Sequence, residues 1–489
     1  MKHFRLITIA CIALLTVSAS HAQTFKTILQ FNGTNGEQAS SALIQGPNGQ
    51  LFGTIIVGGK YGVGTIFEIT PSGVLTDIYD FCPQAGCSDG ANPNAPLLLA
   101  SDGNFYGTTN GGGAHEGGTI FKIIPSTGQL VTIYSFCSLS ACDDGQGPGP
   151  IVQGRNGHLY GTTQRGGTGS HCSTQNCGTI FEVTLSGTLT TLHNFCSLRN
   201  CPDGYQPYGV TLGTDGNFYG TAQLGGPNGD GTIFVMNPAG QLSVLHQFTG
   251  SSDGFVPNPV IQANDGNFYG TTRGGGSTGD NGIVFQITPQ GQFTTIYSFC
   301  ALSKCVDGQG PEEGLTLGSD GNLYGTTYFG GAHQSCGLGM GCGTVFQITT
   351  AGALTTLYSF CPTFGCPDGS DPVASVVQRT DGNFYGTTSA GASTACNSGC
   401  GTVFGLSTGL APFVEAVPSI GKVGYTVRIL GNGLTGTAGV TFNGTPATFT
   451  VFSNTLIKAT VPTGATTGTI QVTTPGGVLS SNVAFQVLP

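Results

Sequence analysis

The chain has few charged residues, and it has no long apolar segment beyond its first 22 residues. Asp, Glu, Lys and Arg make up 8% of the 489 residues, against roughly 25% in ordinary soluble domains. The 14 basic residues are outnumbered by 24 acidic ones, for a formal net charge of −10, and they form no basic patch. A protein without a basic patch lacks the clustered lysine and arginine side chains that bind a phosphate backbone, so nucleic acid is not an expected partner. No membrane span is expected in the mature chain either.

Residues 1–22 have the pattern of a secretory signal peptide. Lys2 and Arg5 precede the apolar stretch 6–17, and Ser20-His21-Ala22 forms a small-x-small cleavage site. The stretch is too short for a membrane anchor, and a lipoprotein cysteine at Cys11 would leave it shorter still. We therefore expect a secreted or surface-exposed protein, exported without lipidation.

One phrase returns seven times along the chain. It reads Asn-Gly-Gln-Leu-Phe-Gly-Thr at 48–54 and Asp-Gly-Asn-Phe-Tyr-Gly-Thr at 102–108. Further copies stand at 156–162, 215–221, 265–271, 320–326 and 381–387, with starts 50 to 61 residues apart. A regular period over most of a chain indicates a repeat architecture.

Each repeat contains four short β-rich runs separated by Asp-Gly and Pro/Gly turns. In the unit 75–121 they are 75–81, 95–100, 104–109 and 118–124. Such runs indicate antiparallel all-β structure, and four strands in each of seven repeats predict a seven-bladed β-propeller over residues 23–408. A right-handed β-helix is the main alternative, but its coils are shorter and need no hairpin at every Asp-Gly. The glycine of each Phe-Tyr-Gly-Thr run suits close approach of a neighbouring blade.

The two ends of the repeat array predict how the ring closes. The run 25–31 has no preceding strand in its own repeat, and the last Gly-Thr-Val-Phe run, 401–406, has no following one. Pairing these runs would complete the seventh blade and remove two exposed sheet edges. In such blades the loop that leads into the inner strand and the loop between the second and third strands emerge on one face. This face would carry all the disulfides.

The cysteines form close pairs along the sequence. Apart from Cys11 they fall into eight pairs, which indicates local disulfides in an oxidising compartment. The alternative, metal binding by thiolates, needs two pairs brought together, and these pairs sit in separate repeats. The predicted disulfides are Cys82–Cys87, Cys137–Cys142, Cys172–Cys177, Cys196–Cys201, Cys300–Cys305, Cys336–Cys342, Cys361–Cys366 and Cys396–Cys400.

The repeats resemble a known family. The phrases Asp-Gly-Asn-Phe-Tyr-Gly-Thr-Thr, Gly-Thr-Ile-Phe-x-Ile-Thr-Pro-x-Gly and Leu-Thr-Thr-Leu-Tyr-Ser-Phe-Cys are similar to the GloVer (Gloeo/Verruco) tandem repeat of exported bacterial proteins. The resemblance covers about residues 25–408 and implies a secreted or surface-displayed protein. It brings no established catalytic residues.

The period stops at Ala411, and cysteine disappears after it. Runs such as 412–418, 424–433, 440–444 and 468–474 resemble an IPT/TIG domain, a small immunoglobulin-like β-sandwich. The resemblance implies a spacer or binding module over residues 411–489.

The repeated aspartates and aromatic residues have both structural and functional interpretations. The Asp-Gly pairs, such as Asp102 and Asp89, could bind calcium, but the first position of a tight turn is the simpler role. No other cofactor is expected. Aromatic residues within the strands are expected in the core. The loop aromatics are candidate sugar-binding residues: Tyr205, Tyr208, Phe255, Tyr328 and Phe329.

An enzyme would need acids and bases that converge near the propeller axis. The candidates are loop residues present in only one or two repeats, and loop drift is the favoured explanation of them over a grafted site: His115, Glu116, Glu312, Glu313 and His333. Two functions therefore stay open. The favoured one is a non-catalytic binding or structural protein whose ligand, an extracellular glycan or protein, meets the disulfide-bearing face. The alternative is an extracellular hydrolase or lyase with a His/Glu site at the propeller mouth.

Overall fold

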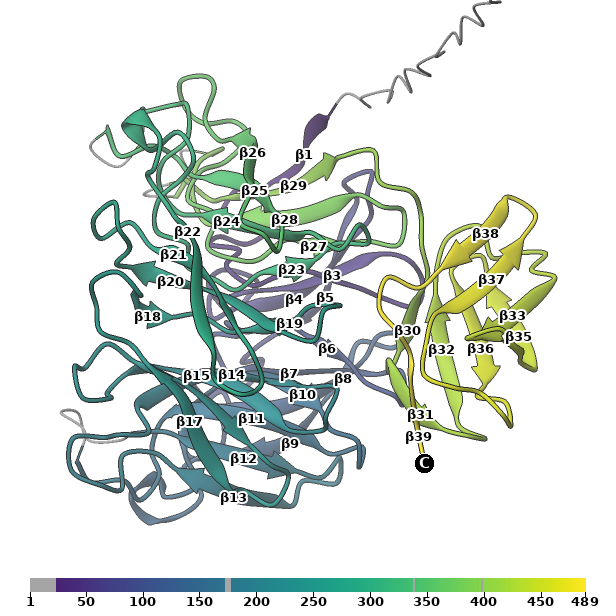
Figure 1. The fold of residues 1–489 in the computed structure, drawn as a ribbon, viewed down its shortest axis with the longest axis horizontal. Helices are drawn as coiled ribbons and strands as arrows, with labels where there is room; N and C mark the ends of the chain where they lie inside the picture. The colour runs from purple at the N-terminus through teal and green to yellow at the C-terminus, as the bar shows by residue number, and fades with distance from the viewer. Residues whose placement is uncertain (1–22, 172–176, 337–338, 394, 397–398) are drawn as a thin grey trace, which may run out of the picture.

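The computed structural model describes residues 23–489 apart from 172–176, 337–338, 394 and 397–398 (Figure 1). The fold is all-β. Among the described residues the helices are two short 3-10 turns, η1 (Ser140–Cys142) and η2 (Ser303–Cys305). The expected signal peptide, residues 1–22, lies outside the described residues.

Each repeat forms one antiparallel sheet, here numbered sheet 1 to sheet 7 in chain order. The strands follow one another in space as in sequence in sheets 1 to 4 and 6, two strands of sheet 5 pair with the same neighbour, and the N-terminal strand of the chain is the outer strand of sheet 7. Sheets 1 to 3 contain β2 (Ile44–Gln45), β3 (Leu51–Ile55), β4 (Thr65–Ile69) and β5 (Leu75–Asp80); β6 (Leu98–Leu99), β7 (Phe105–Thr109), β8 (Thr119–Ile124) and β9 (Gln129–Ser135); β10 (Gln146–Gln153), β11 (Leu159–Arg165), β12 (Thr179–Val183) and β13 (Leu189–Asn194). Sheets 4 and 5 contain β14 (Tyr205–Leu212), β15 (Phe218–Leu224), β16 (Thr232–Met236) and β17 (Leu242–Gln247); β18 (Phe255–Pro257), β19 (Ile261–Gln262), β20 (Phe268–Gly274), β21 (Ile283–Ile287) and β22 (Phe293–Ser298). Sheets 6 and 7 contain β23 (Thr316–Leu317), β24 (Leu323–Thr327), β25 (Thr344–Ile348) and β26 (Leu354–Ser359); β27 (Val377–Gln378), β28 (Phe384–Thr388), β29 (Thr402–Ser407) and β1 (Thr24–Gln30).

The Asp-Gly-Asn-Phe-Tyr motif holds the hairpin between the first two strands of a sheet. In sheet 2 the Asp102 carboxylate accepts hydrogen bonds from Asn104 N (3.0 Å), Asn104 Nδ2 (2.7 Å) and the Tyr106 hydroxyl (2.9 Å). Asp215, Asp265 and Asp320 make the same three bonds. These carboxylates therefore have the turn role that the sequence predicts for this series.

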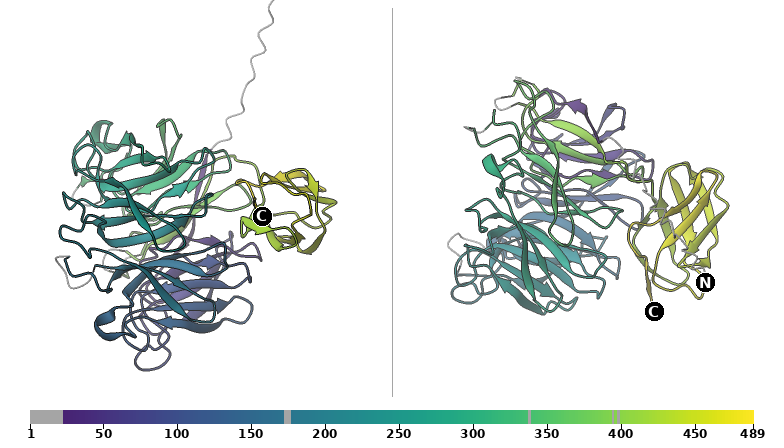
Figure 2. Two further views of the ribbon diagram at one scale, coloured as in Figure 1. Left: turned by 60° about the horizontal axis from the view of Figure 1, so that its bottom comes forward. Right: turned by 45° about the horizontal axis from the view of Figure 1, so that its top comes forward.

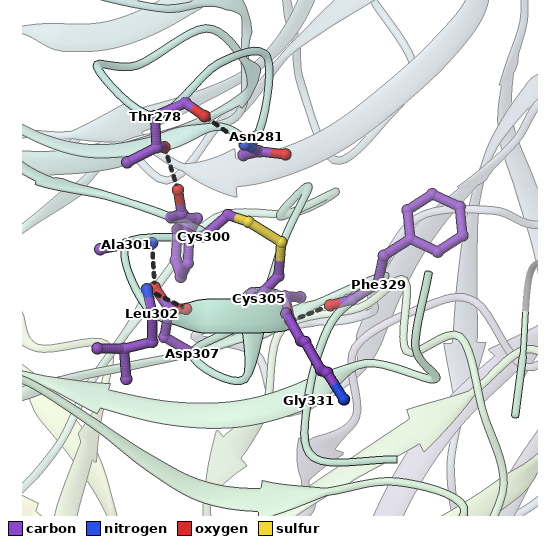
Figure 3. Close-up of a disulfide and its surroundings, with 12 residues drawn as sticks. Thr278, Asn281, Cys300, Ala301, Leu302, Cys305, Asp307, Phe329 and Gly331 are labelled. Atoms are coloured by element: carbon purple, nitrogen blue, oxygen red, sulfur yellow. Dashed lines mark hydrogen bonds between the residues drawn. A yellow bond between two sulfur atoms is a disulfide. The ribbon is translucent and has the colours of Figure 1, made fainter. Parts of the chain in front are cut away.

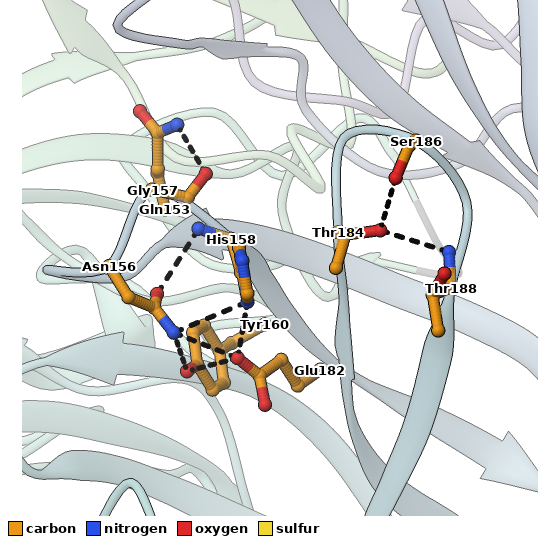
Figure 4. Close-up of polar contacts among 9 residues, drawn as sticks. All are labelled: Gln153, Asn156, Gly157, His158, Tyr160, Glu182, Thr184, Ser186 and Thr188. Atoms are coloured by element: carbon orange, nitrogen blue, oxygen red, sulfur yellow. Dashed lines mark hydrogen bonds and ion pairs between the residues drawn. The ribbon is translucent and has the colours of Figure 1, made fainter.

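Sheets 1 and 3 carry asparagine in place of this aspartate, and a glutamate on the third strand supplies the carboxylate instead. In sheet 3, Glu182 Oε1 accepts hydrogen bonds from the Tyr160 hydroxyl (2.8 Å) and Asn156 Nδ2 (2.8 Å), and it lies 2.6 Å from His158 Nδ1 (Figure 4). In sheet 1, Asn48 Nδ2 donates to Glu68 Oε1 at 2.7 Å. The carboxylate is thus retained although its position in the sequence changes.

The glycine of each Phe-Tyr-Gly-Thr strand is required by its own sheet. A Cβ atom on Gly107 would lie 2.5 Å from the ring of Phe121, its cross-strand partner on β8. The same close approach joins Gly220 to Phe234 and Gly386 to Phe404. The expectation that a neighbouring blade makes this approach is wrong, because the aromatic ring comes from the adjacent strand of the same sheet.

The first strand of the described chain joins the last sheet of the array. β1 pairs antiparallel with β29, with Phe25 opposite Leu406 and Gln30 opposite Thr402. The ring of Phe25 also stacks on Tyr358 of sheet 6, with centroids 3.6 Å apart. The predicted pairing of 25–31 with 401–406 is confirmed.

A repeated threonine connects six of the seven sheets to the next one, whereas the equivalent Thr221 Oγ1 of sheet 4 has no hydrogen-bond partner among the described residues. The hydroxyl of the repeated threonine donates to a backbone oxygen in the segment that leads into the inner strand of the following sheet. The last bond of the series runs from Thr387 of sheet 7 to the backbone oxygen of Ser41, just before sheet 1. The bonds, of 2.9 to 3.3 Å, are Thr54–Ala95, Thr108–Gly149, Thr162–Pro207, Thr271–Glu313, Thr326–Ala374 and Thr387–Ser41.

The C-terminal region forms a separate two-sheet β structure, drawn in yellow in Figures 1 and 2. One apolar cluster, which includes Val427, Ile429, Val440 and Ile457, lies between its sheets. The first sheet contains β30 (Glu415–Val417), β32 (Thr426–Leu430), β36 (Leu456–Thr460) and β35 (Phe449–Ser453), and the second contains β34 (Thr445–Pro446), β33 (Gly439–Phe442), β37 (Ile470–Thr474) and β38 (Gly477–Ser480). β31 (Ile420–Lys422) pairs in parallel with β39 (Gln486–Leu488).

This C-terminal sandwich packs on the face that carries the tight Asp-Gly turns, here called the tight-turn face. Arg428 donates hydrogen bonds to the backbone oxygens of Ser101 and Asp102 in sheet 2. Thr455 Oγ1 donates to the backbone oxygen of Pro47 at 2.8 Å, and Asn432 Nδ2 to Thr380 Oγ1 at 2.7 Å. The sandwich thus reaches the turns of sheets 1, 2 and 7. Its Gln486 also bonds to Thr214 in sheet 4.

The long loops gather on the opposite side (Figure 1), here called the disulfide face. Gly113 N, in the loop between β7 and β8, donates to the backbone oxygen of Cys87 at 2.8 Å, and Gly167, Gly226 and Gly331 make the equivalent bonds to Cys142, Cys201 and Cys305. The two loop classes therefore share a face, as predicted.

Seven of the eight predicted disulfides are present among the described residues. The eighth, Cys172–Cys177, includes a residue outside them. Each disulfide joins neighbours within one loop, as the even, local spacing predicts.

Candidate functional site

Polar side chains from three consecutive sheets converge where the chain leads into the inner strands. The Tyr208 hydroxyl, on β14 of sheet 4, donates to Glu313 Oε2 at 3.1 Å, just before β23 of sheet 6. Asn258 of sheet 5 is 2% exposed, and its Nδ2 donates to the backbone oxygen of Pro311 at 2.9 Å. Because sheet 5 separates sheets 4 and 6, the Tyr208–Glu313 bond must pass on the inner side of sheet 5. This places both side chains toward the axis.

An ion pair and two further polar side chains adjoin this bond. Arg273 Nε, on β20, lies 3.0 Å from Glu312 Oε1. Tyr328 follows β24 directly, and it is close enough to Glu312, Arg273 and Asp371 for their charges to act on its hydroxyl. The backbone of Asp371 bonds to Cys342 and Ser389, both in loops of the disulfide face. We call Tyr208, Arg273, Glu312, Glu313, Tyr328 and Asp371 the axial cluster.

Burial changes the acidity of this cluster. It raises the pKa of Glu313 to about 7, although the hydrogen bonds from Gly314 and Tyr208 oppose the change. Burial also raises the pKa of Asp371 to about 6. The pKa of Glu312 is raised by burial too, against the lowering influence of Arg273. Near neutral pH the Glu313 carboxyl is therefore part-protonated beside the Arg273–Glu312 ion pair, which suits both donation to and acceptance from ligand hydroxyls.

Four of the sequence-predicted residues belong to the axial cluster: Tyr208, Glu312, Glu313 and Tyr328. Phe329 packs edge-on against Tyr328, with ring centroids 4.5 Å apart. Tyr205 and Phe255 start β14 and β18 and are, like the other three aromatic candidates, half-buried rather than exposed.

The remaining candidates lie away from the axis. His115 and Glu116 are exposed in the β7–β8 loop, where Ala114 N bonds to Ser135 Oγ of the outermost strand β9. His333 follows Ala332, whose N–H bonds in the same way to Ser359 of the outermost strand β26. These three residues are not brought together with Glu312 and Glu313, so a shared His/Glu centre is not formed by them.

Sequence reasoning missed Arg273 and Asp371. Arg273 occupies the position after Thr-Thr at which other repeats have asparagine, glutamine, tyrosine or serine, as at Asn110 and Ser389. Asp371 precedes a repeated proline at a position where Asn92 and Gly310 stand in other repeats. Both are departures from the repeat pattern, and an alignment of the seven units by position would have marked them.

The second aspartate series has a structural role on the disulfide face. Asp89 accepts hydrogen bonds from the Tyr79 hydroxyl (3.0 Å) and Cys82 N (3.0 Å), which ties the disulfide loop to the outermost strand. Asp307 accepts a hydrogen bond from the Tyr297 hydroxyl in the same manner, and it also holds Ala301 N and Leu302 N (Figure 3). In sheets 3 and 4 a histidine replaces the tyrosine, with His193 Nε2 2.9 Å from Asp203 and His246 Nε2 3.1 Å from Asp253. Burial lowers the pKa of His246, and Asp253 opposes this change.

Two disulfides meet at the boundary between sheets 6 and 7. The sulfur atoms of Cys336–Cys342 and Cys361–Cys366 all lie within 4.8 Å of one another, and Cys336 Sγ is 3.6 Å from Cys366 Sγ. The expectation that pairs in different repeats stay apart is wrong here, because the loop between β24 and β25 packs on the segment that leads into sheet 7. Both pairs are oxidised, so their sulfur atoms are engaged in disulfide bonds.

Sheets of this form, six of them joined to the next by one repeated hydrogen bond, define a β-propeller-like protein, and one known structure agrees with this class. The extracellular domain of a hybrid two-component system from B. thetaiotaomicron is similar over 96% of this chain and 60% of that one, with 13% identity and a TM-score of 0.51. This chain thus spans 60% of that chain's length. A protein named as a 6-phosphogluconolactonase, from Bacteroides fragilis, is similar over 69% of this chain and 86% of that one, with 15% identity and a TM-score of 0.42.

The family is shown by the sequence. The Gloeobacter/Verrucomicrobia repeat matches residues 15–209, 140–335 and 206–452, and the chain belongs to this repeat family. No curated protein sequence matches the chain. Within the part of the chain that the structure describes, no helix is both long and apolar enough to cross a membrane.

Proposed function

We propose that this chain is an exported, non-catalytic binding protein whose axial cluster binds an extracellular glycan. In this account residues 1–22 are its signal peptide, 23–408 form a seven-bladed propeller closed by β1, and 411–489 are an IPT/TIG domain. The β1–β29 pairing and the Thr387–Ser41 bond support closure, because they join sheet 7 to sheet 1. The disulfides support an extracellular location.

The observation that carries the ligand site is the bond between Tyr208 and Glu313 across sheet 5. It brings side chains of three sheets to one place at the mouth of a rigid scaffold, which is where ligand sites form. The tight-turn face is covered in part by the C-terminal sandwich, so the disulfide face is the open side of the axis.

The chemistry of the axial cluster suits a carbohydrate. Glu312 and Arg273 offer a planar acceptor and donor pair, while Glu313 supplies a hydroxyl-type donor when protonated and the Tyr208 oxygen, whose hydrogen is donated to Glu313, supplies an acceptor. The half-buried rings of Tyr328 and Phe329 offer an apolar face to a sugar ring at the same mouth. The scarcity of charge elsewhere makes this group distinct from the rest of the surface.

The proposal is tested with a glycan array on the mature protein, followed by calorimetry on the glycan that binds. We expect R273Q/E312Q and Y328A to weaken binding by roughly tenfold or more, because each removes a contact from the site. H115A/E116Q, on the rim of the same face, is the matched control and should bind as the wild type does. Loss of binding in the rim variant with full binding in the axial variants would overturn the proposal.

One observation favours the alternative function, an extracellular hydrolase or lyase. The pKa of about 7 at Glu313 would leave this carboxyl partly protonated at neutral pH, as a general acid must be. The binding function is preferred because Glu312 is held by Arg273 and the histidine candidates lie elsewhere. Product formation from a bound glycan that E313Q abolishes without weakening binding would establish the alternative instead.

A further inference from the structure

Four disulfide loops present a large apolar side chain to solvent. Leu139, Leu198 and Leu302 are 56%, 66% and 55% exposed, and Phe364 is 102% exposed. Each lies between the two cysteines of its loop. We call these four residues the apolar tips. Single exposed apolar residues are common on protein surfaces, but an exposed apolar side chain in each of four equivalent loops indicates a shared role.

Hydrogen bonds hold the backbone of two of the apolar tips, and a disulfide closes the loop of all four. Asp144 accepts a hydrogen bond from Leu139 N at 3.2 Å, and Asp307 accepts one from Leu302 N at 3.1 Å (Figure 3). A disulfide closes each loop, so the side chain cannot withdraw by refolding of the backbone. A contact made through these tips therefore costs little conformational entropy.

The tips share one face and are not contiguous. Their loops lead into sheets 3, 4, 6 and 7, and all follow the outermost strand of the preceding sheet on the disulfide face. Figure 1 shows these loops on the side opposite the C-terminal sandwich. A partner that touches all four must be broad and able to accept separate apolar side chains.

Basic residues stand beside several exposed apolar residues of this face although the chain is acidic overall. Arg199 follows Leu198 directly, and Lys304 lies in the same loop as Leu302; both are exposed. On the same face Lys60 lies 5.2 Å from the ring centroid of the exposed Tyr61. Lysine or arginine beside an apolar side chain is the pattern of residues that insert into a lipid interface and contact its head groups.

We propose that the disulfide face docks on an anionic lipid bilayer, with the apolar tips inserted at the interface and the adjacent basic residues on the head groups. A bilayer is flat, deformable and apolar below its surface, so it can receive four separate tips at once. A protein interface or a second copy would instead favour one contiguous apolar core. This inference goes beyond the glycan site and does not depend on it.

Vesicle flotation of the oxidised mature protein tests the proposal. Phosphatidylcholine vesicles are compared with vesicles that also contain phosphatidylglycerol. We expect flotation with the anionic vesicles, and a partition coefficient lower by roughly tenfold or more in L139N/L198N/L302N/F364N. The matched control V74N/V131N/F452N/V478N changes four exposed apolar residues away from the loop tips and should float as the wild type does. K60Q/R199Q/K304Q should remove the preference for phosphatidylglycerol.

Three results would overturn the proposal. The wild type does not float with either vesicle, or the control variant loses flotation as much as the tip variant, or light scattering shows a dimer that the tip variant converts to a monomer without any vesicle binding. The last result would make a second copy the occupant of this face. Circular dichroism and a thiol assay confirm that each variant is folded and oxidised, since all eight changed apolar positions are exposed and should tolerate asparagine.

Discussion

Replacing Glu313 by glutamine should change how the stability of the protein depends on pH. In the folded state burial raises the pKa of this carboxyl to about 7, from an ordinary value of 4.5. The folded protein therefore keeps a proton that the unfolded chain releases. This contribution to stability is complete below about pH 4.5 and is lost as the pH rises through about 7. At 1.36 kcal/mol for each pKa unit, up to about 3 kcal/mol is lost between these limits.

Urea unfolding at pH 5, 6, 7 and 8, followed by circular dichroism, measures this effect. E313Q cannot ionise, so its stability relative to the wild type should rise with pH, by about 2–3 kcal/mol between pH 5 and 8. Glu415 and Asp371 also have raised pKa values, of about 7 and 6, but they are present in both proteins and cancel in the difference. E116Q, at an exposed rim position, is the control. A difference between E313Q and wild type that stays constant from pH 5 to 8 would refute the burial of this carboxyl.

Four further predictions follow from the packing and the hydrogen bonds. G107A should destabilise the protein by about 1–3 kcal/mol, because its Cβ would meet the Phe121 ring at 2.5 Å, whereas G111A, with no atom nearer than 3.9 Å, should not; denaturant midpoints compare the two. H246Y should protect the protein below about pH 6.5, since the low pKa of His246 makes acid destabilise the wild type and tyrosine holds the equivalent aspartate in other sheets; equal acid sensitivity of both proteins in thermal melts would count against this. Deletion of residues 23–32 should lower the stability of all seven sheets together rather than of one end, because it removes β1 from sheet 7; hydrogen exchange confined to one sheet would contradict ring closure. Non-reducing peptide mapping should find every disulfide within its own loop, and a bridge between Cys336 and Cys366 would show that the adjacent pairs exchange.

The architecture of the repeats was predictable because it is repeated and local. The Asp-Gly turn and the alternation within each short strand follow from neighbouring residues, and seven copies of the same pattern average out local exceptions. Even the non-local pairing of 25–31 with 401–406 could be predicted, because the two runs are the unmatched ends of a periodic series. The residue that approaches Gly107 could not be predicted, because the repeat period does not indicate which aromatic ring packs against this glycine.

The axial cluster was predictable only in part. Glu312, Glu313, Tyr208 and Tyr328 stood out as polar or aromatic loop residues absent from most repeats. Their convergence depends on how far each sheet turns about the axis, which no local pattern encodes. Arg273 could not be recognised because it lies within a strand rather than in a loop. Asp371 could not be recognised because the following Pro372 indicates only a turn. The contact between Arg428 and Asp102 joins positions more than 300 residues apart, and nothing in either sequence segment indicates that the two residues meet.

The most direct test of the account is a crystal structure of the mature protein with the glycan selected by the array. We expect density for a sugar at the inner side of the disulfide face, in contact with Arg273, Glu312 and Tyr328. Density on the rim beside His115, or in the cleft of about 790 Å³ between the sheets and the C-terminal sandwich that Arg155, Lys422 and Tyr425 line, would contradict it.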